Sequence, residues 1–346
     1  PFKGKLELNE LKKRLHTLPD QPDAIPYITS YYNETWGFCL TQDQFDTLEE
    51  GTYTIIVDTN LFDGELNYGE FLIKGQSSKE IFLSTYICHP SMANNELSGP
   101  VVVTYLAKWL MKMSNLQYSY RIVFVPETIG AIVYIKQNLK IMKQNIFAGF
   151  NVTCIGDNRT YSYLPSRNGK TISDIAAKHV LKWTDANYSS YTWFDRGSDE
   201  RQYCAPGIDL PIASIQRTRY GKYPEYHTSL DNLEDVVTPE GLFGGYSAMK
   251  KAIKAIEKNI YYKVSTLCEP QMGKRGLYPT IATQKNLDDV RFMMNFISVC
   301  DGNNSLIEIA ELLGVPIWNL YELADKLHNL DVIEVQNPDV NTIIIS

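Results

Sequence analysis

The sequence of 346 residues lacks any apolar run that approaches the roughly 20 residues needed to span a bilayer. It also does not open with the basic segment and apolar core of a secretory signal. The chain starts at Pro1 without an initiator methionine, so we expect that an N-terminal piece precedes it. The first two absences argue against a membrane protein, and the singly scattered cysteines, which suit reduced thiols, predict a cytoplasmic one.

Cysteine pairs and excess basic charge are missing as well. The six cysteines are scattered singly with no CxxC pair, which argues against a disulfide framework and against a structural zinc site of the Cys type. The net charge is −7, so the chain lacks the positive surface that nucleic acids or anionic membranes attract. Hydrophobic residues make up 44% of the sequence, which is enough for a large core and two or three domains.

Alternation of strand-like and helix-like segments indicates the fold class. Short β-branched and aromatic runs alternate with segments whose apolar residues recur every three to four positions, which predicts α/β layers around a mostly parallel or mixed sheet. The expected strands are Ile81–Ile87, Tyr120–Val125, Ala148–Cys154, Ser190–Phe194 and Leu210–Ile215. The expected helices are the segment after Ser98, Ile129–Met142, Ile172–Trp183 and Pro239–Asn259.

The two ends of the chain differ from this central pattern. A helix is expected over Leu6–Leu18, and Trp36–Gly75 has strand-like runs in which Asp63 and Gly64 predict a hairpin turn. We therefore expect an α/β domain of residues 1–24 and 76–263, and a small β insertion of residues 25–75. A linker of residues 264–280 then leads to a winged helix-turn-helix domain of residues 281–346, with three helices and two short strands.

Charge decides what this C-terminal domain can bind. Residues 281–346 contain three Lys or Arg side chains and ten Asp or Glu side chains. A recognition helix must neutralise phosphates, and the candidate helix carries only Lys326. We expect no nucleic-acid binding, and instead a packing or protein-contact role that includes a homo-oligomer contact.

Candidate catalytic residues fall where predicted strands pass into loops or helices. His89 follows the strand Ile81–Ile87, Asn95 lies in the loop behind it, Glu127 follows Tyr120–Val125, and His227 lies in an irregular aromatic stretch after the next apolar strand. Ligands of open α/β sheets collect at the carboxyl ends of strands, where histidines can bind a metal or act as bases. The alternatives are that the histidines and Asn95 satisfy turns and that Glu127 is an acid at a helix N-terminus.

These segments resemble the co-catalytic zinc aminopeptidases and their glutaminyl-cyclase relatives. The resemblance rests on HPS at His89, NNELSG at Asn94, ETIG at Glu127, NVTCIGD at Asn151, and GSDERQY and EYHTSLDNLEDV further on. The chain is most similar to the aminopeptidase-like proteins of bacterial polysaccharide-biosynthesis loci, which carry a small β insertion and a C-terminal winged helix. The resemblance implies a three-layer α/β/α zinc-exopeptidase-like fold.

The resemblance also implies site roles and one clear departure. His89 and His227 match metal ligands, and Glu127 matches the general base. The three carboxylate ligands of the family fall on Asn95, Thr128 and Thr153, none of which carries a charge. Two zinc ions would then be poorly neutralised, so one zinc is expected, held by the two histidines and a third donor.

The third donor and the substrate contacts stay open at the level of sequence. Asn95 offers a weak carbonyl ligand, while Asp157 or Asp199 would supply a charge. Asp199 would alternatively meet a substrate amine, and an arginine would grip a carboxylate or phosphate, next to Tyr226. The candidate arginines are Arg167, Arg196, Arg217 and Arg219.

Three functions fit these residues. The first is a metal-dependent aminopeptidase or amidohydrolase that acts on a small peptide or amide through zinc-activated water, with Glu127 as general base. The second is a cyclase or acyl-transfer reaction in the same pocket. The third is a binding or scaffold protein with a degenerate site, which the loss of the three carboxylates favours.

Overall fold

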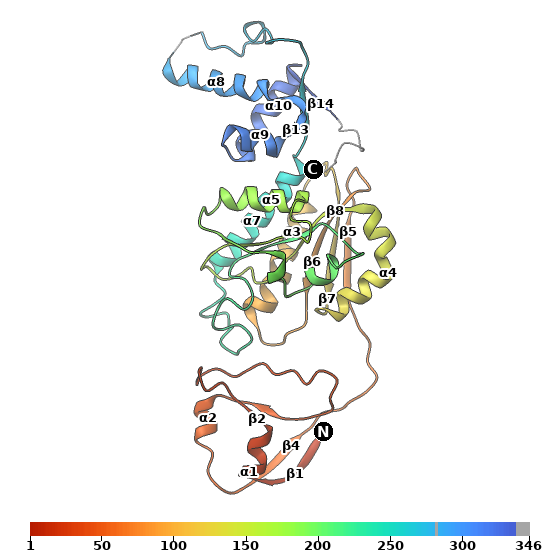
Figure 1. The fold of residues 1–346 in the computed structure, drawn as a ribbon, viewed down its shortest axis with the longest axis vertical. Coiled ribbons are helices and arrows are strands. Elements are labelled where there is room, and N and C mark those ends of the chain that lie inside the picture. Colours follow the sequence, from red (N-terminus) through yellow and green to blue (C-terminus); the bar gives the residue numbers. More distant parts are fainter. Residues whose placement is uncertain (281–282, 337–346) are drawn as a thin grey trace.

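The computed structural model describes residues 1–280 and 283–336, which form three bodies arranged along the long axis of the molecule (Figure 1). The first, which we call the N-terminal lobe, comprises residues 1–57. Its β1 and β4 strands pair antiparallel from Phe2↔Val57 to Glu7↔Thr52. Its elements are β1 (Phe2–Glu7), α1 (Leu8–Leu11), β2 (Leu15–His16), β3 (Phe38–Cys39), α2 (Gln42–Asp46) and β4 (Thr52–Val57).

The central domain is built on a sheet with the strand order β10-β9-β11-β8-β6-β7-β5 over the residues that the structure describes. β6 pairs parallel with β7 and β8, and β11 pairs parallel with β8. β5 and β9 run antiparallel to their neighbours β7 and β11. The strands are β5 (Gly69–Ile73), β6 (Glu80–Tyr86), β7 (Ser119–Val125), β8 (Ile146–Asn151), β9 (Ser162–Leu164), β10 (Ser189–Ser190) and β11 (Ile212–Gln216).

Helices cover both faces of this sheet, so that β6 is buried along its whole length. α3, α5 and α7 pack on one face with the larger hydrophobic core, while α4 and α6 cover the other face. The helices are α3 (Ser98–Leu110), α4 (Ile129–Asn145), α5 (Ile172–Lys182), α6 (Glu200–Tyr203) and α7 (Pro239–Glu257). Local sequence fixes their starts: the Thr171 side chain caps α5 in a capping box with Asp174, and Pro239 opens α7.

The C-terminal domain combines three helices with a sheet of order β13-β12-β14 in the described residues. Its α9 packs against α5 of the central domain, where Glu311 is paired with His179 and Lys182. The elements are β12 (Tyr261–Val264), α8 (Gln284–Ser298), β13 (Asp301–Ser305), α9 (Leu306–Leu313), α10 (Tyr321–Asn329) and β14 (Ile333–Gln336). The second strand expected at residues 341–346 lies outside the described residues.

The expected hairpin at Asp63 and Gly64 is wrong. β4 pairs with β1 in the N-terminal lobe, whereas β5 joins the edge of the central sheet beside β7. An Asp-Gly pair reports only the local preference for a turn, while the partner of a strand is decided by distant residues that need the same hydrogen bonds.

Strand pairing also moves the expected domain boundaries. β1 and α1 belong to the N-terminal lobe rather than to the central domain, because β1 needs β4 as its partner. β12 pairs with β13 and β14, so the C-terminal domain begins near residue 261 and not at 281. The expected helix over Leu6–Leu18 is shortened to α1 and a 3₁₀ turn. Among the described residues, none of the helices combines the length and apolar character that crossing a membrane requires.

Candidate active site

The candidate site lies at the carboxyl edge of the central sheet. His89 follows the end of β6, Glu127 follows the end of β7, and His227 lies on the long segment between β11 and α7. Because β6 and β7 are parallel neighbours, their ends bring His89 and Glu127 to the same edge. The structure thus brings together three of the residues that the sequence analysis singled out.

The two histidine rings face each other closely. Their centroids are 5.1 Å apart at an interplanar angle of 34°. His89 Nε2 lies 3.6 Å from Glu127 Oε2. In contrast, no hydrogen-bond partner for the buried Nε2 of His227 is present among the described residues. A neutral imidazole nitrogen without a partner is a ligand atom that a metal ion or a substrate donor could use.

Glu96 holds His89 in place, and the sequence analysis missed it. Its carboxylate accepts the backbone N–H groups of Cys88 and His89 at 2.5 and 2.7 Å, and it lies 3.3 Å from His89 Nδ1. Glu96 belongs to a π-helical turn, Ala93–Leu97, immediately before α3. A carboxylate on the far nitrogen is the usual way in which proteins orient a metal-binding histidine. The acidic residue within NNELSG was the only sequence signal for it.

Burial and neighbouring charges give the two histidines opposite protonation states. Burial alone would lower the pKa of His89, but its contacts with Cys88, Glu96 and Glu127 raise that pKa to about 10. Burial, together with the charge on His89, lowers the pKa of His227 to about 4. Near neutral pH and without a metal, His89 is therefore a cation between carboxylates, and His227 is neutral.

Glu127 is held from the segment before α6. The Ser198 hydroxyl donates a hydrogen bond of 2.8 Å to Glu127 Oε1. Burial raises the pKa of Glu127, while this hydrogen bond and the charge on His89 oppose the rise. A carboxylate with a raised pKa, placed beside a histidine at the edge of the sheet, suits general acid and base work.

Asp199 and Arg201 fix the backbone beside Glu127. Asp199 Oδ1 accepts the Thr128 N–H at 2.7 Å, and burial raises the Asp199 pKa well above its usual value. Its other oxygen, Oδ2, is buried without a hydrogen-bond partner in the described chain. Arg201 donates to Thr128 Oγ1 and to the Ser198 carbonyl. Thr128 itself has φ of 62°, a conformation that a residue with a β-branched side chain rarely adopts.

The other expected oxygen ligands are occupied by internal hydrogen bonds. The Asn95 carbonyl oxygen accepts the Tyr86 hydroxyl at 2.9 Å, and Thr153 donates to the same Tyr86 hydroxyl. The Asp157 carboxylate accepts both the N–H and the hydroxyl of Thr218 and the amide of Asn94. Asp157 therefore ties two loops together, and the structure does not bring it to the two histidines.

Of the four arginines expected to grip substrate, Arg167 lies away from the site, and the other three stack on aromatic rings. Arg167 lies at the opposite edge of the sheet, because β9 runs antiparallel to β11, and it is paired with Asp209. The exposed Arg196 stacks over Trp193 at 4.8 Å, and the buried Arg217 stacks under Tyr161 at 3.9 Å. Arg219 stacks on Tyr191 and Tyr220. Arg201, which the sequence analysis did not single out, lies close enough to Glu127 for its charge to oppose the rise in the pKa of that carboxyl.

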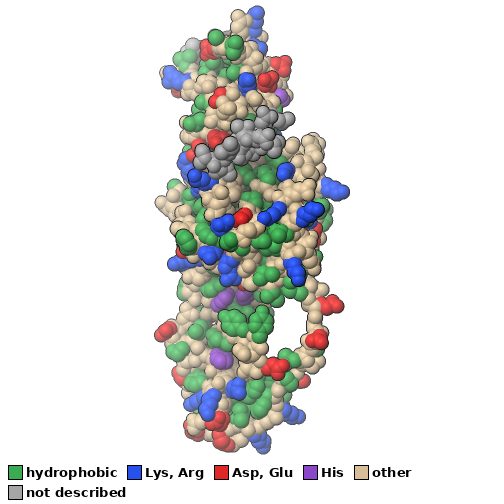
Figure 2. Space-filling view, turned by 45° about the vertical axis from the view of Figure 1, so that its right-hand side comes forward, with side chains coloured by type: hydrophobic (Ala, Val, Ile, Leu, Met, Phe, Trp, Pro, Cys, Tyr) green, Lys and Arg blue, Asp and Glu red, His purple; other side chains and the backbone are tan. Residues whose placement is uncertain are grey.

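The N-terminal lobe contributes an unexpected residue, Tyr27. Its ring centroid is 5.3 Å from that of His89 and 5.2 Å from that of His227. Tyr226, which the sequence did single out, stacks on His227 at 3.8 Å and 17°. Histidine atoms are visible at this junction between the lobe and the central domain, beside a group of hydrophobic side chains (Figure 2). No local pattern could signal Tyr27, because it reaches the site from 62 positions before His89.

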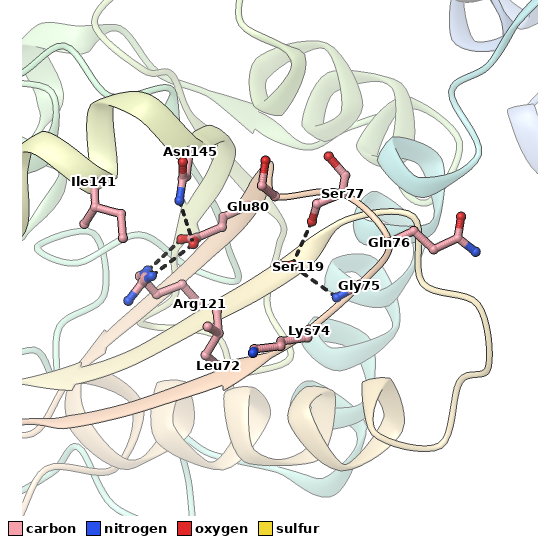
Figure 3. Close-up of a pocket in the computed structure, with 11 residues that line it drawn as sticks. Leu72, Lys74, Gly75, Gln76, Ser77, Glu80, Ser119, Arg121, Ile141 and Asn145 are labelled. Carbon is pink, nitrogen blue, oxygen red and sulfur yellow. Dashed lines mark hydrogen bonds and ion pairs between the residues drawn. The ribbon is translucent and has the colours of Figure 1, made fainter.

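A cavity of about 450 Å³ opens at this junction. Residues 18–21 and 26–28 of the lobe line it, together with Pro224, Tyr226, His227 and Thr228 of the central domain. A second cavity, of about 360 Å³, lies at the opposite edge of the sheet, around Arg121 (Figure 3). In the second cavity Arg121 is paired with Glu80 and Glu70, and Asn145 also donates to Glu80.

The residues present suit one metal ion better than two. Two histidines, one with an unpartnered buried nitrogen and one oriented by Glu96, are available as ligands. Within residues 1–280 and 283–336, no group of three or more His, Cys, Asp or Glu side chains is arranged to hold a metal ion. Any remaining ligands of a single ion would therefore come from solvent or substrate.

Comparisons with known proteins relate the whole chain to two kinds of domain. Residues 16–259 match a family described as a domain of unknown function, DUF4910, and residues 259–335 match a winged helix-turn-helix family. The chain is 41% identical over 337 residues to a Clostridium acetobutylicum protein, provisionally named a polysaccharide biosynthesis protein with an aminopeptidase-like domain. That alignment covers 97% of this chain and 77% of the relative.

Solved structures give the same relationship. A crystal structure of a protein from Clostridium acetobutylicum, provisionally named a peptidase, matches with a TM-score of 0.90 and 40% identity. The match covers 97% of this chain and 76% of that one. BSAP, a zinc aminopeptidase from Bacillus subtilis, matches with a TM-score of 0.49 and 14% identity, over 73% of this chain and 68% of that one.

Proposed function

Because this chain belongs to the DUF4910 family and has an aminopeptidase-like domain joined to a winged helix, we propose that it is a metal-dependent amidohydrolase of the aminopeptidase type. The observation that carries the proposal is the group formed by His89, His227 and Glu127, in which a buried histidine nitrogen has no partner in the described chain. We propose one zinc ion, held by His89 and His227. Zinc bound there would polarise an amide carbonyl and lower the pKa of a water molecule.

The protein's own side chains would handle the proton. Glu127, beside the His89 ring, takes a proton from the attacking water and returns it to the leaving amine. The hydrogen bond from Ser198 holds the Glu127 carboxylate, so that only one oxygen is left to receive the proton. Asp199 and Arg201 keep the backbone at Thr128 in its strained conformation, which sets the direction of the Glu127 side chain.

Substrate contacts follow from the groups nearest to these residues. Asp199 has a buried oxygen without a hydrogen-bond partner in the described residues, and a substrate ammonium would satisfy it. We propose that Arg201, whose charge acts on Glu127, meets a substrate carboxylate or phosphate. The name of the Clostridium relative refers to polysaccharide biosynthesis, and we propose that the amide hydrolysed here belongs to an intermediate of such a process.

A scaffold function is the second candidate, because Asn95, Thr128 and Thr153 replace three carboxylates of the zinc aminopeptidases. Two observations favour an enzyme. Both Thr128 and His227 have positive φ, at 62° and 59°, and Asp199 keeps an unpaired buried oxygen. Each such feature destabilises the fold by about 1–3 kcal/mol, which selection for stability alone would remove. A cyclase or acyl-transfer reaction would use the same groups, and product analysis separates it from hydrolysis.

Metal content and turnover test the proposal together. We expect the wild-type protein, dialysed against metal-free buffer and then given zinc, to retain about one ion per chain and to hydrolyse aminoacyl anilides or amides. His89→Ala and His227→Ala should each lose the zinc and the activity. His16→Ala, which changes a histidine in β2 of the N-terminal lobe, is the control. Failure of the wild-type protein to retain zinc at micromolar concentrations, with no hydrolysis, would establish the scaffold function instead.

For the winged helix we propose a packing and protein-contact role, with contacts between copies of the chain included, rather than nucleic-acid binding. Glu311 of α9 is already engaged by His179 and Lys182 of α5, and Asp325 of α10 lies 3.9 Å from Lys258. The acidic composition of the winged-helix domain also opposes the binding of nucleic-acid phosphates. Fluorescence anisotropy with duplex DNA at low salt should show no binding, and light scattering would report any homo-oligomer. A cytoplasmic location stays a prediction.

A further inference from the structure

The cavity between the N-terminal lobe and His227 is preformed by the backbone. The Tyr27 N–H donates to the His227 carbonyl at 3.1 Å, and the Ser229 N–H donates to the Ile25 carbonyl at 2.9 Å. Pro26 and Thr228 form an isolated antiparallel bridge between these two bonds. The lobe segment therefore runs as a short strand along the loop that carries His227, and it fixes the position of Tyr27.

Tyr27 lies against the proposed reaction centre and has a free hydroxyl. Its ring contacts both histidine rings. Within the described residues, no side-chain hydrogen bond involves its hydroxyl, so the group is available to a ligand.

The cavity wall combines flat apolar surfaces with one unpaired carboxylate. Pro19, Pro26, Ile28 and Tyr226 provide apolar and ring surfaces. Asp20 is the acidic residue of the wall, and its carboxylate makes no hydrogen bond or ion pair in the described chain. Ring surfaces favour stacking on a flat ligand, and an exposed carboxylate attracts hydroxyl or ammonium donors and repels anions.

We propose that this cavity is the specificity pocket of the site, and that it binds a ring-bearing substrate group with hydroxyl donors and no negative charge. The proposal deepens the proposed function and rests on it, because it assigns the part of the substrate adjoining the scissile amide to a pocket built by the N-terminal lobe. A tyrosine-like side chain and a neutral or amino sugar ring share this chemistry. The volume of about 450 Å³ accommodates either one.

Binding of two small probes to the zinc-free protein tests the pocket without relying on hydrolysis. The probes are L-tyrosinamide and methyl α-D-glucosaminide, followed by saturation-transfer NMR and by titration calorimetry. We expect at least one probe to bind, and its identity distinguishes an aromatic source from a sugar source. 4-Carboxyphenylalaninamide, which replaces the phenol by an anion, should bind more weakly than L-tyrosinamide.

Variants then locate the binding. Tyr27→Ala should weaken the binding of the probe about tenfold or more, and Asp20→Asn should weaken it roughly fivefold. The matched controls are Tyr31→Ala and Asp23→Asn, which change exposed residues of the same segment outside the cavity wall. Tyr27→Phe should lie between wild type and Tyr27→Ala, since it keeps the ring and loses the hydroxyl.

The results separate this inference from the function it rests on. If neither probe binds, or if Tyr27→Ala and Asp20→Asn bind the probe as tightly as their controls, the pocket assignment is overturned even when zinc binding and hydrolysis are intact. If a probe binds with the expected dependence on Tyr27 and Asp20, the pocket is supported, whether or not the protein retains zinc.

Discussion

The two edges of the central sheet both carry buried polar groups, but the two sets differ in how many of their polar atoms have hydrogen-bond partners. At the amino edge, all three nitrogens of the buried Arg121 guanidinium are paired with Glu80 or Glu70. Figure 3 shows the pairing with Glu80. Tyr134 completes that network through Glu70. At the carboxyl edge, His227 Nε2 and Asp199 Oδ2 have no partners in the described residues, and Thr128 and His227 adopt positive φ.

This difference separates a structural polar cluster from a site built for a ligand. A buried charge is tolerated in a stable fold when its hydrogen bonds are complete, as they are around Arg121. Unpaired atoms and strained backbone persist only where something other than stability maintains them. Four predictions test this comparison.

The largest expected effect is on catalysis at the carboxyl edge. Glu127→Gln keeps the size of the side chain and removes the proton acceptor, so kcat/KM for amide hydrolysis should fall about 10²- to 10⁴-fold. Zinc content should be unchanged, and the free energy of unfolding should stay within about 1 kcal/mol of wild type, because the amide oxygen can still accept the Ser198 hydrogen bond and His89 keeps Glu96 as its partner. Steady-state kinetics and urea denaturation measure the two quantities. Full activity in Glu127→Gln would remove Glu127 from the chemistry.

The amino edge should respond in the opposite way. Arg121→Met leaves Glu80 buried without its cation and should lower the free energy of unfolding by about 3–5 kcal/mol. Hydrolysis per folded molecule should be unchanged. Arg201→Met is the matched variant at the carboxyl edge: it loses hydrogen bonds to neutral oxygens only, so the stability change should stay near 1 kcal/mol. Equal destabilisation by the two substitutions would contradict the distinction between the edges.

A third histidine, His179, differs from His227 in that both of its ring nitrogens have partners. Its Nδ1 is paired with Glu311, and its Nε2 accepts the Ile317 N–H at 2.9 Å, at the contact between α5 and the C-terminal domain. Burial lowers the pKa of His179, although Glu311 opposes this. The unfolded chain, in which this histidine titrates near 6.5, then binds the proton more readily, so stability should be complete above that pH and fall below it.

His179→Gln isolates this contribution, since glutamine can make similar hydrogen bonds but does not titrate. Between about pH 6.5 and 5 the wild type should lose more stability than the variant in urea denaturation, whereas near pH 8 the curves should run parallel. The pKa of Glu311 is lowered, so its own contribution is lost only below its ordinary value of 4.5, outside this window. Parallel curves over the whole range would show that His179 does not titrate on unfolding.

The smallest effect is expected at Arg167, which the sequence analysis placed among the substrate contacts. Its ion pair with Asp209 is exposed, so Arg167→Ala should change stability by less than about 1 kcal/mol. KM and kcat should both be unchanged, because Arg167 lies at the opposite edge of the sheet from His89. A raised KM in Arg167→Ala, with Arg196→Ala as the comparison, would bring Arg167 back to the substrate.

Much of the architecture could be predicted from the sequence. The alternation of buried strands and amphipathic helices predicted β6, β7, β8, α4, α5 and α7 within a few residues of their bounds. The resemblance to aminopeptidase-like proteins of polysaccharide-biosynthesis loci, with a C-terminal winged helix, is confirmed by the Clostridium relative and the domain matches. Both conclusions rest on local periodicity and on motif residues close together in the chain.

Predictions that depended on distant partners did less well. The Asp63-Gly64 hairpin failed because β4 and β5 each find a partner elsewhere. Arg167 was assigned to the wrong edge because the direction of β9 is not encoded within it. Tyr27, Glu96 and Arg201 were missed, since each becomes part of the site only through contacts made after the chain folds.

The sequence by itself determined β6, β7, β8, α4, α5 and α7, and that His89 and Glu127 follow strands, because side-chain burial has a period that local residues set. Only the tertiary structure decided that the rings of His89 and His227 lie beside each other, and that the N-terminal lobe supplies Tyr27 to both. The reason is physical: a strand or loop must pair its backbone groups and bury its apolar face, but many partners in the chain could satisfy it equally well. The choice among them is made by the packing of the whole molecule.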